Sequence, residues 1–181
     1  TSKHDRTRRL RQPWLLLLLA GLFVQTSPAA PPLNVVFILA DDLGASDLAC
    51  YGADLHETPR LDQLAREGVR FTQAYAMSVC SPTRASILTG RHAARLHMTT
   101  WRESAISPTR DKPLLPPPTV GDLPTAIPNL AQSLKAAGYL TLHAGKWHLG
   151  DAAHSPEALG FDINIGGTHW GAPATYFHPF S

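Results

Sequence analysis

The pattern of apolar and polar positions along the chain predicts alternating strands and helices. Residues 34–40 (NVVFILA) are continuously apolar and rich in β-branched side chains, which is typical of a strand buried on both faces of a parallel sheet. Residues 69–76 alternate well enough to predict a second strand, and residues 139–144 predict a third.

Helices are predicted between and after these strands, over residues 58–68, 81–90 and 128–138. Each opens with residues that suit a first helical turn, such as Thr-Pro, Ser-Pro or proline, and each ends at a glycine. Residues 104–128 contain seven prolines and predict a long surface loop, and no element is predicted after residue 151. The order of elements predicts a layered α/β fold with a mostly parallel sheet.

Composition and charge narrow the class of protein. Apolar residues make up 44% and charged residues 17% of the chain, which is typical of a globular protein rather than a disordered one. At roughly 150 residues per domain, 181 residues predict about one domain. The first thirty residues hold five of the 16 basic residues and one of the 14 acidic ones, so the remainder is slightly acidic. This balance gives no support for nucleic-acid binding.

Residues 1–30 resemble a secretory signal peptide. Basic residues precede the apolar run 14–24, and small residues follow it. The run is shorter than the roughly 20 residues that span a bilayer, so no stable membrane span is expected, although a retained signal anchor is the alternative. We therefore expect residues 1–30 to be a signal peptide, residues 31–181 to be the exported domain, and the compartment to be periplasmic, extracellular or of lysosomal type.

Asp41 and Asp42 follow the first predicted strand, at the sheet edge where ligands gather in α/β proteins. Adjacent carboxylates repel each other unless a cation lies between them, and their hard oxygens favour Ca²⁺ or Mg²⁺. A plain turn cap is the alternative.

Cys80 stands just ahead of the second predicted helix, at an N-terminus where backbone N–H groups and the helix dipole favour an anion. Arg84 lies about one turn further on, so its planar guanidinium can reach the same end and hold a sulfate or phosphate. A tyrosine-phosphatase loop is excluded, because only three residues separate the cysteine from the arginine. A buried structural cysteine, or a disulfide with Cys50, is the alternative.

Lys146 and His148 follow the third predicted strand. At a spacing of two they point to one face of an extended chain, where an ammonium and an imidazole can hold an anionic ester and move a proton. A solvated loop is the alternative for this pair alone.

Together these three clusters resemble the sulfatase family. SVCSPTRASILTG at 78–90 looks like the first sulfatase signature, and GYLTLHAGKWH at 138–148 looks like the second. NVVFILADDLG at 34–44 is similar to the strand and aspartates that open these enzymes. The resemblance implies an alkaline-phosphatase-like layered α/β fold with a mostly parallel central sheet, truncated at its C-terminal side.

The resemblance also implies roles for individual residues. Cys80 corresponds to the cysteine that a maturing enzyme oxidises to Cα-formylglycine, whose hydrate attacks the sulfur of a sulfate ester. Arg84 corresponds to the residue that supports the hydrate. Lys146 corresponds to a sulfate contact, and His148 corresponds to a residue that hydrogen-bonds the hydrate and helps its collapse.

For the metal, the resemblance assigns Asp41, Asp42 and the oxidised Cys80 to a calcium ion. Further metal ligands, a second lysine and another histidine are expected beyond Ser181, so residues 1–181 alone are expected to be catalytically incomplete. The implied substrate is a sulfated small molecule or glycan. A phosphonate or phosphate ester hydrolase of the same superfamily, and a non-catalytic module that binds sulfated glycan, are the alternatives.

Overall fold

The computed structural model describes residues 32–107, 111, 113–114 and 117–177. The predicted signal peptide lies outside these residues. The chain divides into two units, residues 1–39 and 40–181, and every helix and strand below belongs to the second unit. Among the described residues, no helix is both long and apolar enough to cross a bilayer.

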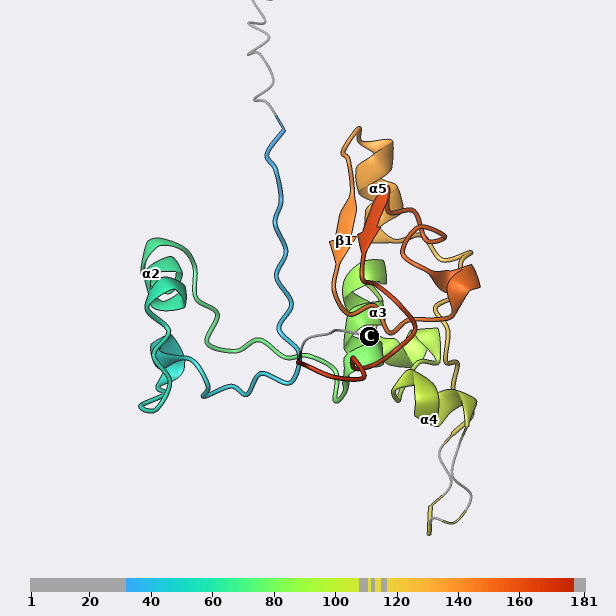
Figure 1. Ribbon diagram of the computed structural model, residues 1–181, viewed down its shortest axis with the longest axis horizontal. Helices are drawn as coiled ribbons and strands as arrows, with labels where there is room; N and C mark the ends of the chain where they lie inside the picture. Colours follow the sequence, from blue (N-terminus) through green and yellow to red (C-terminus); the bar gives the residue numbers. More distant parts are fainter. Residues whose placement is uncertain (1–31, 108–110, 112, 115–116, 178–181) are drawn as a thin grey trace, which may run out of the picture. The chain divides into compact units, whose positions relative to one another are not determined.

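The three predicted helices are confirmed (Figure 1). They are α2 over Pro59–Glu67, α3 over Cys80–Thr89 and α5 over Leu130–Ala136. Gly90 follows α3 with φ +64°, a left-handed conformation that glycine adopts without a steric penalty. Short 3₁₀ helices occur among the described residues as well: η1 at Ala49–Tyr51, η2 at Ala93–Leu96 and η3 at Ala152–His154.

Two details of the helix predictions are corrected. Pro128 was expected to open α5, but the helix begins at Leu130 and Asn129 is its cap. The side chain of Asn129 accepts a hydrogen bond from the N–H of Gln132, and the side chain of Gln132 accepts one from the N–H of Asn129. The predicted loop 104–128 does not begin as a loop, because α4 occupies Arg102–Ile106.

The described sheet consists of two parallel strands, β1 over Leu142–Ala144 and β2 over Ile163–Ile165, with Leu142 paired to Ile163 (Figure 1). The third predicted strand is thus confirmed in a shorter form, and the parallel direction is as predicted. Strand β2 was not predicted, because three residues carry too short a pattern to distinguish a strand from a loop.

The predicted strands 34–40 and 69–76 are wrong for this structure: both segments are irregular and exposed. A strand is stabilised by hydrogen bonds to its neighbour, and strand pairing among the described residues is confined to β1 and β2. The apolar pattern therefore has no ladder to join, and Val36 and Ile38 are each 85% exposed.

Asp162, which precedes β2, binds Thr141, which precedes β1. Its carboxylate pairs with Lys135 at 2.5 Å and accepts hydrogen bonds from the backbone N–H and the hydroxyl of Thr141, each at 2.9 Å. The bond from Lys135, followed by those from Thr141, lowers the pKa of Asp162 to about 2. The connection that leads into β2 is thus tied by a carboxylate that stays ionised.

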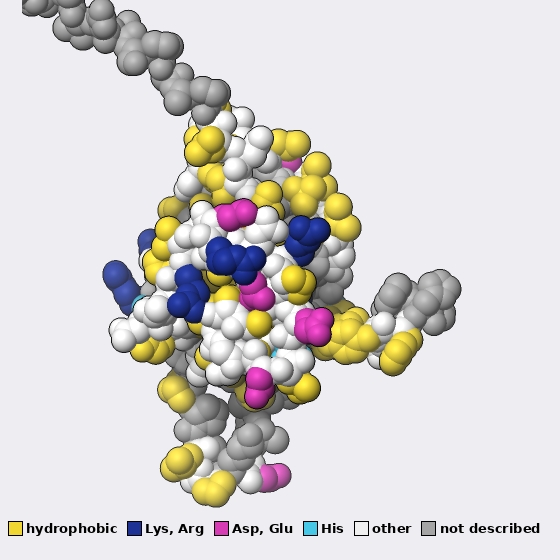
Figure 2. Space-filling model, turned by 90° about the vertical axis from the view of Figure 1, so that its left-hand side faces the viewer, with side chains coloured by type: hydrophobic (Ala, Val, Ile, Leu, Met, Phe, Trp, Pro, Cys, Tyr) yellow, Lys and Arg dark blue, Asp and Glu magenta, His cyan; other side chains and the backbone are white. Residues whose placement is uncertain are grey.

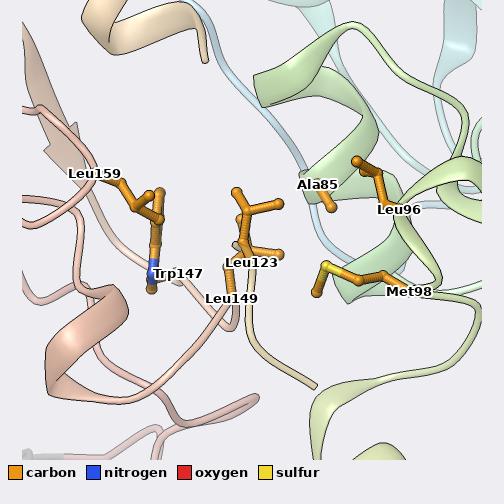
Figure 3. Close-up of a cluster of buried hydrophobic side chains, with 7 residues drawn as sticks. All are labelled: Ala85, Leu96, Met98, Leu123, Trp147, Leu149 and Leu159. Carbon is orange, nitrogen blue, oxygen red and sulfur yellow. The ribbon is translucent and has the colours of Figure 1, made fainter. Parts of the chain in front are cut away.

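The hydrophobic core joins α3 to the segment after β1. Its buried side chains are Ala85, Leu96, Met98, Leu123, Trp147, Leu149 and Leu159 (Figure 3). Trp147 and Leu149 are 2% and 0% exposed. Because they flank His148, packing of the core sets the path of the chain on both sides of that histidine.

Many apolar side chains lie outside this core. Hydrophobic side chains are visible at the surface in Figure 2, among scattered basic and acidic ones. Exposed apolar side chains in such number favour association with other chains.

We expect a polypeptide of residues 32–181 by itself to self-associate and to bind a hydrophobic dye. The double variant Val36→Lys and Ile38→Lys should associate less, because two charges interrupt the apolar run at positions that are already exposed. Sedimentation velocity and dye fluorescence measure both effects. A monomer that binds no dye, or a double variant that associates like the parent, would contradict this account of the surface.

Candidate active site

The structure brings the residues predicted from three separate motifs together at the start of α3. Cys80 is the first residue of that helix, and Arg84 lies one turn further along it. Lys146 and His148 lie in the turn after β1. Direct contacts join Cys80 to His148, and a second set of contacts joins Arg84 and Lys146 to Asp41.

Cys80 and His148 are in contact through their side chains. The Sγ atom of Cys80 lies 3.3 Å from Nδ1 of His148. His148 is 3% exposed and has a left-handed backbone with φ +60°, which is uncommon outside glycine. Backbone strain of this kind is often found at functional sites, where a side chain has to be held in one orientation.

Ser81 fixes the backbone around this contact. Its hydroxyl donates to the carbonyl oxygen of His148 at 2.9 Å and accepts a hydrogen bond from the N–H of Arg102 at 3.2 Å. Ser81 is fully buried. One hydroxyl therefore ties α3 to the His148 turn and to the start of α4.

Asp41 lies between two cationic side chains. One of its carboxylate oxygens is 2.6 Å from Nζ of Lys146, and the other is 3.2 Å from Nη2 of Arg84. Partial burial raises the pKa of Asp41, but the hydrogen bonds and charges of Lys146 and Arg84 outweigh this effect, so the net pKa lies below its usual value. Asp41 is therefore an anion held by two cations.

Arg84 also supports the turn that carries Lys146. Its Nη1 donates to the carbonyl oxygen of Lys146 at 2.5 Å. Its Nε is buried and has no hydrogen-bond partner among the described residues. One donor of the guanidinium is therefore buried without a partner within the described structure.

Asp42 is not drawn into this cluster. It is exposed, has φ +54°, and makes no hydrogen bond or ion pair with another described residue. Within the described part of the chain, Asp122, Asp151 and His154 are the three possible metal ligands that lie within 4.8 Å of one another. Asp41, Asp42 and Cys80 do not form such a group.

The chemistry of Asp41 and Asp42 nevertheless fits a calcium ion. Two adjacent carboxylates offer hard oxygens, and each carboxylate has about four acceptor sites. Asp41 can therefore keep its hydrogen bonds to Lys146 and Arg84 and still coordinate an ion. Asp42 has both oxygens available within the described structure.

A disulfide between Cys50 and Cys80 is not formed, since both cysteines are free thiols. The alternative in which Cys80 serves as a disulfide partner is therefore wrong for this structure.

The sequence prediction missed Glu103, and it gave Ser81 a place at the start of the helix but not the bridge to His148 and Arg102. Glu103 of α4 has its Oε2 atom 2.7 Å from Nε2 of His148. No local pattern marks this residue, because it stands at the edge of the proline-rich segment and 45 positions from the histidine. Only the tertiary structure brings the two together.

Comparisons with known proteins point to one family. The family model described as Sulfatase matches residues 33–176. Human arylsulfatase A is 45% identical over 156 residues, which cover 84% of this chain and 27% of the relative. N-acetylgalactosamine-6-sulfatase of Sus scrofa is 38% identical over 172 residues, covering 92% of this chain and 31% of the relative.

Solved structures agree. The crystal structure of Ps i-CgsB in complex with k-i-k-neocarrahexaose is similar with a TM-score of 0.55 and 32% identity, and the match covers 70% of this chain and 27% of that one. This chain thus spans about a quarter to a third of the length of the relatives that it matches. The similarity supports the predicted α/β, alkaline-phosphatase-like fold for the part that the chain contains.

We expect Ser81→Ala to destabilise the complete gene product that contains this chain. It leaves a buried carbonyl at His148 and a buried N–H at Arg102 without partners, at a cost of about 1–3 kcal/mol for each orphaned group. Urea unfolding measures the loss.

Ser86→Ala in the same helix is the matched control. The hydroxyl of Ser86 is buried and has no partner among the described residues, so its removal should change stability by less than about 0.5 kcal/mol. Equal stability losses in the two variants would show that the Ser81 bridge does not matter.

Proposed function

Because this chain belongs to the sulfatase family, we propose that the complete protein hydrolyses sulfate esters of aryl or carbohydrate alcohols at the Cys80 site. The observation that carries the proposal is the contact of Cys80 with His148, next to the Asp41, Arg84 and Lys146 cluster. This arrangement combines a position for a nucleophile, an imidazole that can transfer a proton and two cationic side chains near the N-terminus of α3.

Residue 80 is proposed to act as formylglycine, made from Cys80 by a maturing enzyme that reads the Cys80-x-Pro82-x-Arg84 motif. This group would supply a hydrated aldehyde as the oxygen nucleophile for the ester sulfur. The thiol Sγ lies 3.3 Å from Nδ1 of His148, so the imidazole is placed to accept or return a proton at the side chain of residue 80.

The cationic side chains are proposed to hold the sulfate. Lys146 is bound through its ammonium to Asp41, and its side chain is 20% exposed, so it is fixed in direction while still open to a ligand. Arg84, which is bound to Asp41 and to the carbonyl oxygen of Lys146, adds a second positive charge. Such preorganised donors stabilise negative charge more than mobile water does.

A calcium ion is proposed at Asp41 and Asp42, with the oxidised side chain of residue 80 as a further ligand. The ion would neutralise the anionic ester. The adjacent carboxylates support this assignment through their hard oxygen atoms.

The substrate class and the compartment are proposals as well. Relatives named for aryl and for N-acetylgalactosamine-6-sulfate substrates, and a neighbour in complex with a neocarrahexaose, support a sulfated small molecule or glycan. Export is proposed from the signal-like residues 1–30.

The function is tested by assaying the complete gene product, produced with a maturing enzyme, on 4-nitrophenyl sulfate and 4-nitrophenyl phosphate. Sulfatase function predicts the higher kcat/KM on the sulfate ester. A preference for phosphate or phosphonate esters would favour the related hydrolase, and binding of sulfated glycan without turnover would favour a binding module.

We expect peptide mass spectrometry to show residue 80 about 18 Da lighter than cysteine after maturation, as oxidation of the thiol to an aldehyde requires. Cys80→Ala should abolish turnover and leave the protein folded, whereas the same change at the other free cysteine, Cys50→Ala, should leave turnover intact. An active protein whose Cys80 is unmodified would refute the formylglycine assignment.

We expect the double variant Asp41→Asn and Asp42→Asn to lose calcium binding and turnover together, because amides cannot neutralise the ion. Calorimetric titration of the metal-free complete protein with Ca²⁺ measures binding. Asp54→Asn, at an exposed aspartate, is the control. Unchanged calcium affinity in the double variant would show that the ligands are elsewhere.

A further inference from the structure

Glu103 makes a direct contact with the site that no sequence motif assigns. Its Oε2 atom lies 2.7 Å from Nε2 of His148, on the opposite side of the ring from Cys80. We propose that Glu103 is a positioning residue that fixes the tautomer and the orientation of the His148 ring toward residue 80. This inference rests on the proposed function for the meaning of that orientation, although the orientation itself can be measured separately.

The tautomer follows from the hydrogen-bonding capacities of the two groups. An ionised carboxylate only accepts hydrogen bonds, so Nε2 of His148 must carry the proton that it donates to Glu103. In a neutral imidazole the other nitrogen then has a free lone pair. Nδ1, which faces the side chain of residue 80, is therefore the acceptor.

Glu103 is suited to this part because its carboxylate is ionised. Partial burial raises its pKa, but the hydrogen bond with His148, its backbone hydrogen bond and the positive charge of Arg102 outweigh that effect and lower the net pKa below its usual value. The neighbouring Arg102 is engaged by Asp122 at 2.5 Å. Among the described residues, His148 is the only side chain that Glu103 contacts through a hydrogen bond or ion pair.

The rest of the structure fixes the His148 backbone, and the bond to Glu103 restricts rotation of the ring. The N–H of His148 donates to the carbonyl of Thr168 at 3.1 Å, and its carbonyl accepts from Ser81. Gly171 packs against the ring so closely that a Cβ atom there would lie 2.6 Å from Cε1. A rotation of the ring by 180° would place carbon atoms instead of nitrogen atoms next to Cys80 and Glu103. The hydrogen bond to Glu103 opposes that rotation.

The α4 helix places Glu103 through buried contacts. Arg102 is 8% exposed, its backbone N–H donates to Ser81, and its guanidinium binds Asp122. The residue beside Glu103 is thus held at both its backbone and its side chain. A carboxylate on so constrained a segment can restrict a partner ring in a way that a mobile surface glutamate cannot.

The test compares Glu103→Gln, Glu103→Ala and the control Glu67→Gln, an exposed glutamate on α2, in the matured complete gene product. Glutamine keeps an oxygen acceptor and alanine does not. We expect kcat on 4-nitrophenyl sulfate to fall about 10-fold to 100-fold in Glu103→Gln, as for other residues that orient a catalytic ligand, and further in Glu103→Ala. KM should change little, because the loss concerns the reacting geometry.

A second measurement reads the ring without reference to turnover. In protein labelled with ¹⁵N-histidine, the nitrogen shifts of His148 should report the Nε2–H tautomer in the parent and a mixture of tautomers in Glu103→Ala. The peaks are assigned by their loss in His148→Gln.

These two readouts separate the possible results. An Nδ1–H tautomer in the parent, or tautomer and kcat unchanged in Glu103→Ala, would overturn the inference. So would variants that lose only thermal stability while kcat per folded molecule stays constant. If the parent does not hydrolyse sulfate esters, the proposed function fails, while the ¹⁵N shifts still decide whether Glu103 positions the ring.

Discussion

The buried hydroxyl of Ser81 is the contact on which the geometry of the site depends. It is fully buried and bridges the carbonyl of His148 and the N–H of Arg102. The residue before it is Cys80, and the residue after Arg102 is Glu103. The same bridge thus sets the spacing of Cys80, His148 and Glu103, which come from three separate segments. Breaking the bridge would leave the buried carbonyl of His148 and the buried N–H of Arg102 unpaired. The free-energy cost of those unpaired groups stabilises this spacing.

Charge is the second constraint on the site. Asp41 accepts hydrogen bonds from Lys146 and Arg84, and this single carboxylate holds both cations in place without fully cancelling their charge. The cluster therefore keeps an excess of positive charge beside residue 80. A site of this kind favours an anionic ester, and it is compatible with a metal ion only if further carboxylates such as Asp42 take part.

The sequence predicts the helices and the site better than it predicts the sheet. Proline and glycine mark the ends of α2 and α3 locally, so their bounds follow from neighbouring residues. The apolar segment 34–40 depends on a partner strand, which the local pattern does not contain, and strand β2 is too short to have a pattern. The resemblance to sulfatase motifs assigned Cys80, Arg84, Lys146 and His148 to one site, but Glu103 is brought to His148 by tertiary structure alone.

The most direct test of this account is a crystal structure of the matured complete gene product soaked with inorganic sulfate. We expect one sulfate ion bound next to the side chain of residue 80, with Lys146 Nζ within hydrogen-bonding distance of its oxygens. Nδ1 of His148 should face residue 80, and Nε2 should face Glu103. Sulfate bound away from residue 80, or a His148 ring turned away from it, would contradict the account.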